Sequence, residues 1–210
     1  NGRYHVMLTN AGGGYSRWKD YDVTRWREDA TCDAWGSFCY LRDVSSGHFW
    51  STSYQPTRSS GERYQAIFTE GRAEFRRHDG GIDTHTEIAV SPEDDIEVRR
   101  LRITNDSPLP RTIEVTSYTE VVLAPAAADV LHPAFSKLFV QTEILDRPAA
   151  VLCTRRPRSP EEATPWMFQL MAVHGLRDAD GNPTNVGSIS HETDRARFVG
   201  RGNDLQSPQA

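Results

Sequence analysis

The stretch Ile82-Asp83-Thr84-His85-Thr86-Glu87-Ile88-Ala89-Val90 decides the fold class of this chain. Its even positions carry Ile, Thr, Thr, Ile and Val, whereas the odd positions up to residue 87 carry Asp, His and Glu. A period of two residues is typical of a β-strand with one buried face. Gly80 and Gly81 precede the stretch and tolerate positive φ, so we expect a tight hairpin there, reached from a strand around Phe75.

The same alternation recurs along the chain, at residues 113–123 and 138–144. Between Ile96 and Ile103 it slips by one residue at Arg99-Arg100, which predicts a β-bulge. Helix signals are poor, and residues 155–165 are expected to form an exposed loop because Pro165 follows the possible helix start at Ser159-Pro160 within a turn or two. Strand candidates separated by turn signals predict an all-β chain, a large antiparallel β-sandwich forming a single domain over residues 1–210.

Composition excludes two classes of partner. The 24 basic and 29 acidic residues give a net charge of −5, so no basic excess points to nucleic acid. The longest nearly apolar run, residues 121–128, is far shorter than the roughly 20 residues of a membrane-spanning helix, so we expect no direct membrane insertion.

The cysteines indicate a cellular compartment, and the chain ends indicate a longer parent protein. Three cysteines without a Cys-x-x-Cys spacing favour buried reduced thiols in a reducing, cytoplasmic compartment. The chain opens on Asn1-Gly2-Arg3-Tyr4 and closes on polar residues, so we expect a fragment of a longer multidomain enzyme.

Familiar catalytic and cofactor motifs are absent from the sequence. Ala11-Gly12-Gly13-Gly14-Tyr15 lacks the Gly-Lys-Ser/Thr of a phosphate loop. It is either a turn that needs close backbone packing or a place where a ligand approaches the backbone. His85 and Glu87 share a strand face, but the sequence reveals no third ligand, so we predict no metal site and no cofactor.

The feature of the sequence that points to a function is the distribution of its aromatic residues. Eleven of the 20 aromatic residues fall within residues 1–54, interleaved with arginine and other polar side chains. Trp and Tyr pair a flat apolar face with a polar edge, which suits stacking on a sugar ring. Core packing is the alternative for each of them. The clearest examples lie in Tyr15-Ser16-Arg17-Trp18, in Arg25-Trp26-Arg27 and in Trp50 with Tyr54-Gln55.

These residues also carry a family resemblance. The chain resembles the amino-terminal β-sandwich of glycoside hydrolase family 94, formerly glycosyltransferase family 36, and within it the phosphorylase-like region of cyclic β-1,2-glucan synthases. The resemblance covers nearly the whole chain. The motifs that carry it are Asn10-Ala11-Gly12-Gly13-Gly14-Tyr15-Ser16, Arg25-Trp26-Arg27, Tyr40-Leu41-Arg42-Asp43, Trp50-Ser51, Gln55-Pro56, Glu74-Phe75-Arg76-Arg77, residues 85–90, residues 117–123, residues 132–137 and Arg195-Ala196-Arg197-Phe198.

The resemblance implies a galactose-mutarotase-like supersandwich that packs on a separate (α/α)6 barrel. The family's catalytic Asp lies in that barrel within a Trp-Asn-Asp-Gly-like segment that this sequence lacks, so no catalytic residue is assigned here. It further implies inorganic phosphate as a reactant of the parent enzyme. The partners that it implies are a β-linked gluco-oligosaccharide, the barrel of the same parent chain and a second copy of the chain. The parent is expected in the cytoplasm or on the cytoplasmic side of the inner membrane.

The residues expected to face a sugar or the barrel come from the aromatic motifs and from the 132–137 stretch, which corresponds to a family loop near the sugar acceptor site. They are Tyr15, Ser16, Trp18, Arg25, Trp26, Trp50, Gln55, Phe135, Ser136 and Lys137. For Ser136 and Lys137 a solvated strand edge is the alternative.

Three functions follow, in the order in which the sequence favours them. The first is a non-catalytic carbohydrate-binding and assembly domain of a β-glucan phosphorylase or cyclic β-1,2-glucan synthase-like enzyme. The second is a purely structural interface scaffold, and the third is an independent mutarotase-like epimerase with a converging His and Glu.

Overall fold

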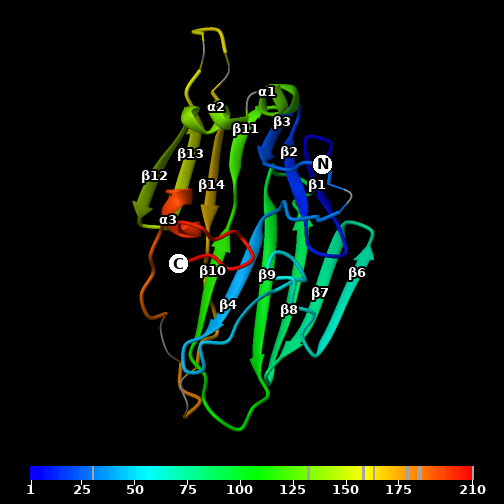
Figure 1. Cartoon of the computed structure of the whole chain (residues 1–210), viewed down its shortest axis with the longest axis vertical. Coiled ribbons are helices and arrows are strands. Elements are labelled where there is room, and N and C mark those ends of the chain that lie inside the picture. Colours follow the sequence, from blue (N-terminus) through cyan, green and yellow to red (C-terminus); the bar gives the residue numbers. More distant parts are fainter. Residues whose placement is uncertain are drawn as a thin grey trace.

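A computed structural model describes residues 1–29, 31–131, 133–157, 159–162, 164–177, 180–183 and 186–209. Within them the regular secondary structure consists mostly of strands, with a few short helical segments (Figure 1). The strands are β1 (Tyr4–Leu8), β2 (Gly14–Trp18), β3 (Tyr21–Thr24), β4 (Phe38–Asp43), β5 (Phe49–Ser51), β6 (Arg63–Thr69), β7 (Arg72–Asp79), β8 (Ile82–Val90), β9 (Glu97–Asn105), β10 (Ile113–Tyr118), β11 (Val121–Pro125), β12 (Val140–Asp146), β13 (Ala149–Arg155) and β14 (Trp166–Leu170). The helical segments are α1 (Ala126–Leu131), α2 (Pro133–Ser136), the 3-10 turn η1 (Lys137–Phe139) and α3 (Arg195–Val199).

The strands form four antiparallel sheets, in the orders β1-β2-β3-β11, β10-β4-β5, β12-β13-β14 and β6-β7-β8-β9. In Figure 1 the β12-β13-β14 sheet and the β6-β7-β8-β9 sheet lie on opposite sides of the molecule, with β10 and β4 between them. The predicted all-β, antiparallel fold class is therefore confirmed.

The hairpin predicted at residues 79–81 is also confirmed. Strand β7 ends at Asp79, β8 begins at Ile82, and these two residues pair directly. Gly80 and Gly81 form the two-residue turn with φ of 54° and 82°, as a turn with two left-handed residues requires. Along β8 the residues alternate between buried and half-buried, as the sequence pattern predicts.

Among the described residues, buried hydrophobic side chains form four core clusters. One joins Phe38 and Tyr40 to Tyr118 and to Phe198 of α3. Another joins Leu41, Trp50 and Ile82. The remaining two are centred on Val23, Leu123 and Cys153 and on Ala73, Phe75 and Ile88.

Two local predictions are wrong. Strand β9 pairs with β8 in unbroken register from Glu97 to Asn105, so no bulge forms at Arg99-Arg100. The alternation continues unbroken because Val98, although apolar, lies on the outer face of the sheet and is 54% exposed. Arg99 lies on the opposite face, where it makes an ion pair with Glu97. Leu138 belongs to η1 rather than to a strand, and the strand begins only at Val140.

Between β13 and β14 the described residues contain no helix, in agreement with the expected loop. Among the described helices, none has the length and apolar character that crossing a membrane requires.

Candidate functional site

A buried ion cluster joins the end of β3 to helix α1 and to the β10–β11 connection. Arg25 follows β3 and is 3% exposed. Its Nε and Nη2 donate to the two carboxylate oxygens of Asp129 at 3.1 and 2.7 Å, and its Nη1 donates to Glu120 at 2.5 Å. Arg27 adds a longer contact of 3.4 Å to Asp129. Since both carboxylates are buried, this arginine fixes α1 against the sheet.

Glu120 is the centre of the cluster. Besides Arg25, Lys137 Nζ lies 2.9 Å and Arg195 Nε 3.3 Å from its carboxylate. Burial by itself raises the pKa of the Glu120 carboxyl, but Lys137, Arg25 and Arg195 together hold the pKa below its ordinary value. Three segments that are distant in sequence therefore meet on one charge.

The segment Ala126–Phe139, which we call the crossover, carries the predicted residues of the 132–137 motif. Ser136 is 3% exposed, and its backbone oxygen accepts from Arg155 Nη1 at 3.0 Å. Phe135 is 63% exposed, and the Lys137 side chain is 43% exposed beyond its ion pair. Residue 132 lies outside the described residues. The crossover thus buries Ser136 and presents Phe135 and Lys137 at the surface.

The predicted aromatic residues near the start are partly accessible. Tyr15 and Trp26 contact one another with ring centroids 5.6 Å apart, and Arg17 lies over the Tyr15 ring. Trp18 donates from Nε1 to Asp95 at 2.6 Å and carries Lys19 above its ring. All three rings are half-buried, and the indole Nε1 of Trp26 is buried without a hydrogen-bond partner among the described residues.

Five of the predicted residues lie in the interior instead: besides Arg25 and Ser136, these are Trp50, Ser16 and Gln55. Trp50 is 1% exposed and packs between Leu41 and Ile82, so it offers no face to a sugar or to a barrel. Ser16, 2% exposed, donates to Glu97 at 2.5 Å. Gln55 is 4% exposed. Alternation alone does not tell an inward Trp from an outward one in a strand as short as β5, where the sequence gives only three positions.

The glycine-rich turn is explained by close packing. A Cβ on Gly13 would lie 2.5 Å from the Asp33 carboxylate, and one on Gly14 would collide with the backbone oxygen of Met7. Thr9 also donates to Asp33. The packing alternative for this motif therefore holds, because a neighbouring carboxylate occupies the space that a side chain would need.

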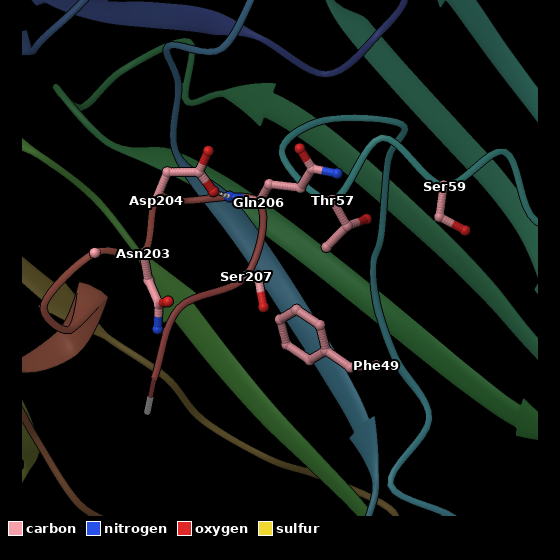
Figure 2. A pocket seen from close by; sticks show the side chains of 8 residues that line it. Phe49, Thr57, Ser59, Asn203, Asp204, Gln206 and Ser207 are labelled. Carbon is pink, nitrogen blue, oxygen red and sulfur yellow. Dashed lines mark hydrogen bonds between the residues drawn. The ribbon is translucent and has the colours of Figure 1, made fainter.

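A cavity of about 480 Å³, which no local sequence signal predicts, lies between strand β5 and the carboxyl-terminal segment. Figure 2 shows the ring of Phe49 on one side and Asn203, Asp204, Gln206 and Ser207 on the other, with Thr57 and Ser59 on the neighbouring loop. Tyr40 anchors the segment by donating from its hydroxyl to the Leu205 oxygen at 2.9 Å. One aromatic face among hydroxyl and amide groups is chemistry that suits a neutral sugar.

One face of β14 exposes large apolar side chains, which we call the β14 row: Trp166, Phe168 and Leu170, 63%, 56% and 48% exposed. The alternate residue Met167 packs inward against the core. An exposed row of this size is typical of an interaction surface.

Two groups of metal-ligating side chains lie on the β6–β9 sheet. The pairing of β7 with β8 brings Glu74 beside His85 and Glu87, a third donor that the sequence did not reveal. Arg72 contacts both carboxylates, at 2.7 and 3.2 Å, so arginine charge already balances this group. The second group is His78, Asp83 and Asp106.

The fold and these surfaces together define the class of protein. It is an antiparallel β-sandwich domain with a polar cavity beside Phe49 and the exposed β14 row at its surface. A family model, "Glycosyl hydrolase 94, supersandwich domain", matches residues 1–210. The chain belongs to this family and corresponds to its supersandwich domain.

Curated relatives agree with this assignment. The chain is 40% identical over 213 residues to the cyclic beta-(1,2)-glucan synthase NdvB of Rhizobium meliloti (strain 1021), an alignment of 100% of this chain and 7% of the relative. It is 31% identical to the N,N'-diacetylchitobiose phosphorylase of Vibrio furnissii, over 67% of this chain and 18% of the relative. It is 25% identical to the solabiose phosphorylase of Paenibacillus borealis, over 81% and 20%. The chain thus spans a fifth or less of these relatives.

Proposed function

We propose that the chain is a non-catalytic carbohydrate-binding and assembly domain of a β-glucan phosphorylase or cyclic β-1,2-glucan synthase-like enzyme. The observation that carries the assembly role is the exposed β14 row. An apolar sheet face is stable in water only at a cost, so it favours a covering partner. The partner that we propose is a catalytic barrel of the same parent chain, since relatives are far longer than this domain. A second copy of the chain is a further proposed partner.

The crossover supports the same role. The ion cluster around Glu120 holds Lys137 in place, while Phe135 stays exposed beside it. A cation and an aromatic ring on one short segment suit contact with a sugar that is held mainly by another domain. Tyr15 and Trp26 offer a second partly exposed aromatic pair for such contacts.

For sugar binding by the domain itself, we propose the cavity beside Phe49. Its polar side chains are hydroxyls and amides with one carboxylate, Asp204, and its volume of about 480 Å³ accommodates a small saccharide. The ligand that we propose is a β-linked gluco-oligosaccharide. The parent is placed in the cytoplasm or at the cytoplasmic face of a membrane, a proposal that the three free cysteines support.

A mutarotase-like epimerase is less well supported. His85 Nε2 lies 2.9 Å from Glu74, which is the required pairing of residue types. However, the Glu74 carboxylate also accepts from Arg72 and Arg76, at 2.7 and 3.1 Å, and these charges hold it as an anion already fully paired. A base that must take a proton needs a free oxygen.

The assembly role is tested by light scattering at increasing protein concentration. We expect self-association of the wild-type domain through the β14 row, and a monomer for the double variant Trp166→Gln, Phe168→Gln. Ile189→Gln is the control, because this side chain is equally exposed, at 60%, but lies outside the row. A wild-type chain that stays monomeric at high concentration would argue against an interface on β14.

The sugar cavity is tested by NMR titration with a β-1,2-linked gluco-oligosaccharide. We expect shifts at Phe49, Asn203 and Gln206, and a loss of at least about tenfold in affinity for Phe49→Ala. The control is Phe68→Ala, whose ring is 51% exposed on another sheet. Equal effects of the two variants would refute this location.

A further inference from the structure

A second cavity, of about 460 Å³, opens on the β6-β7-β8-β9 sheet. Three guanidinium groups, from Arg63, Arg76 and Arg102, belong to its lining on this face, and Asp83 is the only carboxylate among its lining residues. Arg77 is also a lining residue, but its side chain is fully buried and projects from the opposite face of the sheet. This sheet lies at the right of Figure 1. The lining of this second cavity therefore differs in charge from that of the cavity beside Phe49, whose lining residues include the carboxylate of Asp204 and no cation.

The strand register explains how these residues converge. Arg76 of β7 pairs with His85 of β8, and His85 pairs with Arg102 of β9. Directly paired residues project from the same face of an antiparallel sheet, so both arginines flank His85. Their Cα atoms are two strand spacings apart, about 10 Å. Two long flexible side chains can close over a small group that lies between them.

The charges of the lining are unequally compensated. Arg77 is paired with Asp79 at 2.5 Å, and Arg63 lies 3.7 Å from Asp83. Arg76 contacts Glu74 at 3.1 Å but shares that carboxylate with Arg72 and His85. Arg102 makes no hydrogen bond or ion pair within the described part of the chain. The cavity thus retains uncompensated positive charge at Arg102 and in part at Arg76.

The side chains around the cavity disfavour a neutral sugar. The outward-facing lining positions of the strands, such as Gln65 and Thr104, carry no Phe, Tyr or Trp. Tyr64 is also a lining residue, but it projects from the opposite face of the sheet, where its ring stacks on Phe75. A pyranose ring would have no aromatic face to stack on, whereas planar guanidinium groups match the oxygens of phosphate and carboxylate.

We propose that this cavity binds the oxyanion group of a ligand, a phosphate or a carboxylate, between Arg76 and Arg102 and above His85. The site is separate from the Phe49 cavity and does not depend on sugar binding there. Phosphate and carboxylate share the chemistry that the two guanidinium groups recognise, and the two sources are distinguished by the probes of the experiment.

The experiment is calorimetry of the 210-residue chain at low ionic strength, with protein and buffers passed over a chelating resin beforehand so that metal binding at His78, Asp83 and Asp106 does not contribute. The probes are inorganic phosphate, glucuronate and neutral glucose. We expect saturable binding of phosphate, glucuronate or both, and none of glucose. Stronger binding of phosphate identifies a phosphorylated ligand, and stronger binding of glucuronate identifies an acidic sugar.

The variant Arg102→Gln should weaken oxyanion binding about tenfold, the effect of losing one charge-assisted hydrogen bond. The matched control is Arg100→Gln, which removes the same charge from the same strand and face but from an arginine already paired with Glu87. It should change the affinity by less than about twofold. Both variants should keep the wild-type circular dichroism spectrum and affinity for the gluco-oligosaccharide.

Three results would overturn the proposal. One is the absence of binding heat with both oxyanions, and another is an equal loss in the two variants, which would indicate non-specific charge attraction. The third comes from NMR, if phosphate moves signals elsewhere and leaves the ring of His85 unchanged. Failure of this site would leave the Phe49 cavity untouched, because the latter is tested with a neutral ligand.

Discussion

Replacing Arg25 by methionine tests the ion cluster on which the crossover depends. Methionine keeps an unbranched apolar stem but removes the guanidinium that donates twice to Asp129 and once to Glu120. Both carboxylates have side chains less than a tenth exposed, at 6% and 9%. Glu120 keeps Lys137 and Arg195, whereas Asp129 retains only the longer contact to Arg27 and a hydrogen bond from Ser136.

The expected loss in free energy of unfolding is about 3–5 kcal/mol at pH 7, the cost of leaving a buried charge without its partner. Most of it should come from Asp129, which loses its two-pronged contact. Burial raises the pKa of the Asp129 carboxyl, but the contacts to Arg25 and Ser136 outweigh burial and lower it overall.

A lowered folded-state pKa stabilises the protein above the unfolded value of about 4, and that stability is lost as the pH falls through the folded-state pKa. The difference in free energy of unfolding between wild type and variant should therefore have its full value at pH 7 and decrease below about pH 4. Urea unfolding followed by tryptophan fluorescence measures it.

Arg42→Met is the control, because its partner Glu114 and Arg42 itself have side chains 47% and 49% exposed. An exposed pair of this kind should contribute less than about 1 kcal/mol. A loss below about 1 kcal/mol for Arg25→Met, or a loss that does not change between pH 7 and pH 3, would refute the reasoning.

Two further predictions concern other parts of the molecule. Gly13→Ala should destabilise by about 1–3 kcal/mol in urea unfolding, because its Cβ would lie 2.5 Å from the Asp33 carboxylate; Gly187→Ala, with open space around it, should be neutral, and equal effects would contradict the packing explanation. Burial raises the pKa of the Cys39 thiol to about 12 and that of Cys153 to about 11, so both should resist iodoacetamide at pH 8 in the folded chain. Rapid labelling of either, identified by mass spectrometry, would contradict this burial.

The sequence predicted those parts of the fold that depend on local pattern. The alternation at residues 82–90 and the glycines at 80 and 81 determine a strand and a hairpin by backbone geometry alone, and both are found. The bulge at Arg99-Arg100 was wrong because an exposed Val98 was read as a core residue. Periodicity assumes that apolar side chains point inward, and sheet edges break that assumption.

The site was less accessible to sequence reasoning, because its residues meet only through long-range contacts. The motifs pointed to Arg25, Ser136 and Lys137, and the structure places all three around the carboxylates of Glu120 and Asp129. Neither acid carries a local signal that distinguishes it among the 29 acidic residues. Likewise, the Phe49 cavity is lined by residues that lie more than 140 positions apart in the sequence. Sequence spacing does not predict contacts between segments that are so distant.

The most direct test of the proposed function is calorimetric titration of the wild-type chain with a β-1,2-linked gluco-oligosaccharide, with chromatography of the sugar afterwards in the presence of inorganic phosphate. We predict saturable binding in the millimolar range or tighter, with the oligosaccharide recovered intact. A folded domain that gives no binding heat at millimolar sugar would contradict the carbohydrate-binding role, and cleavage of the oligosaccharide would contradict the non-catalytic one.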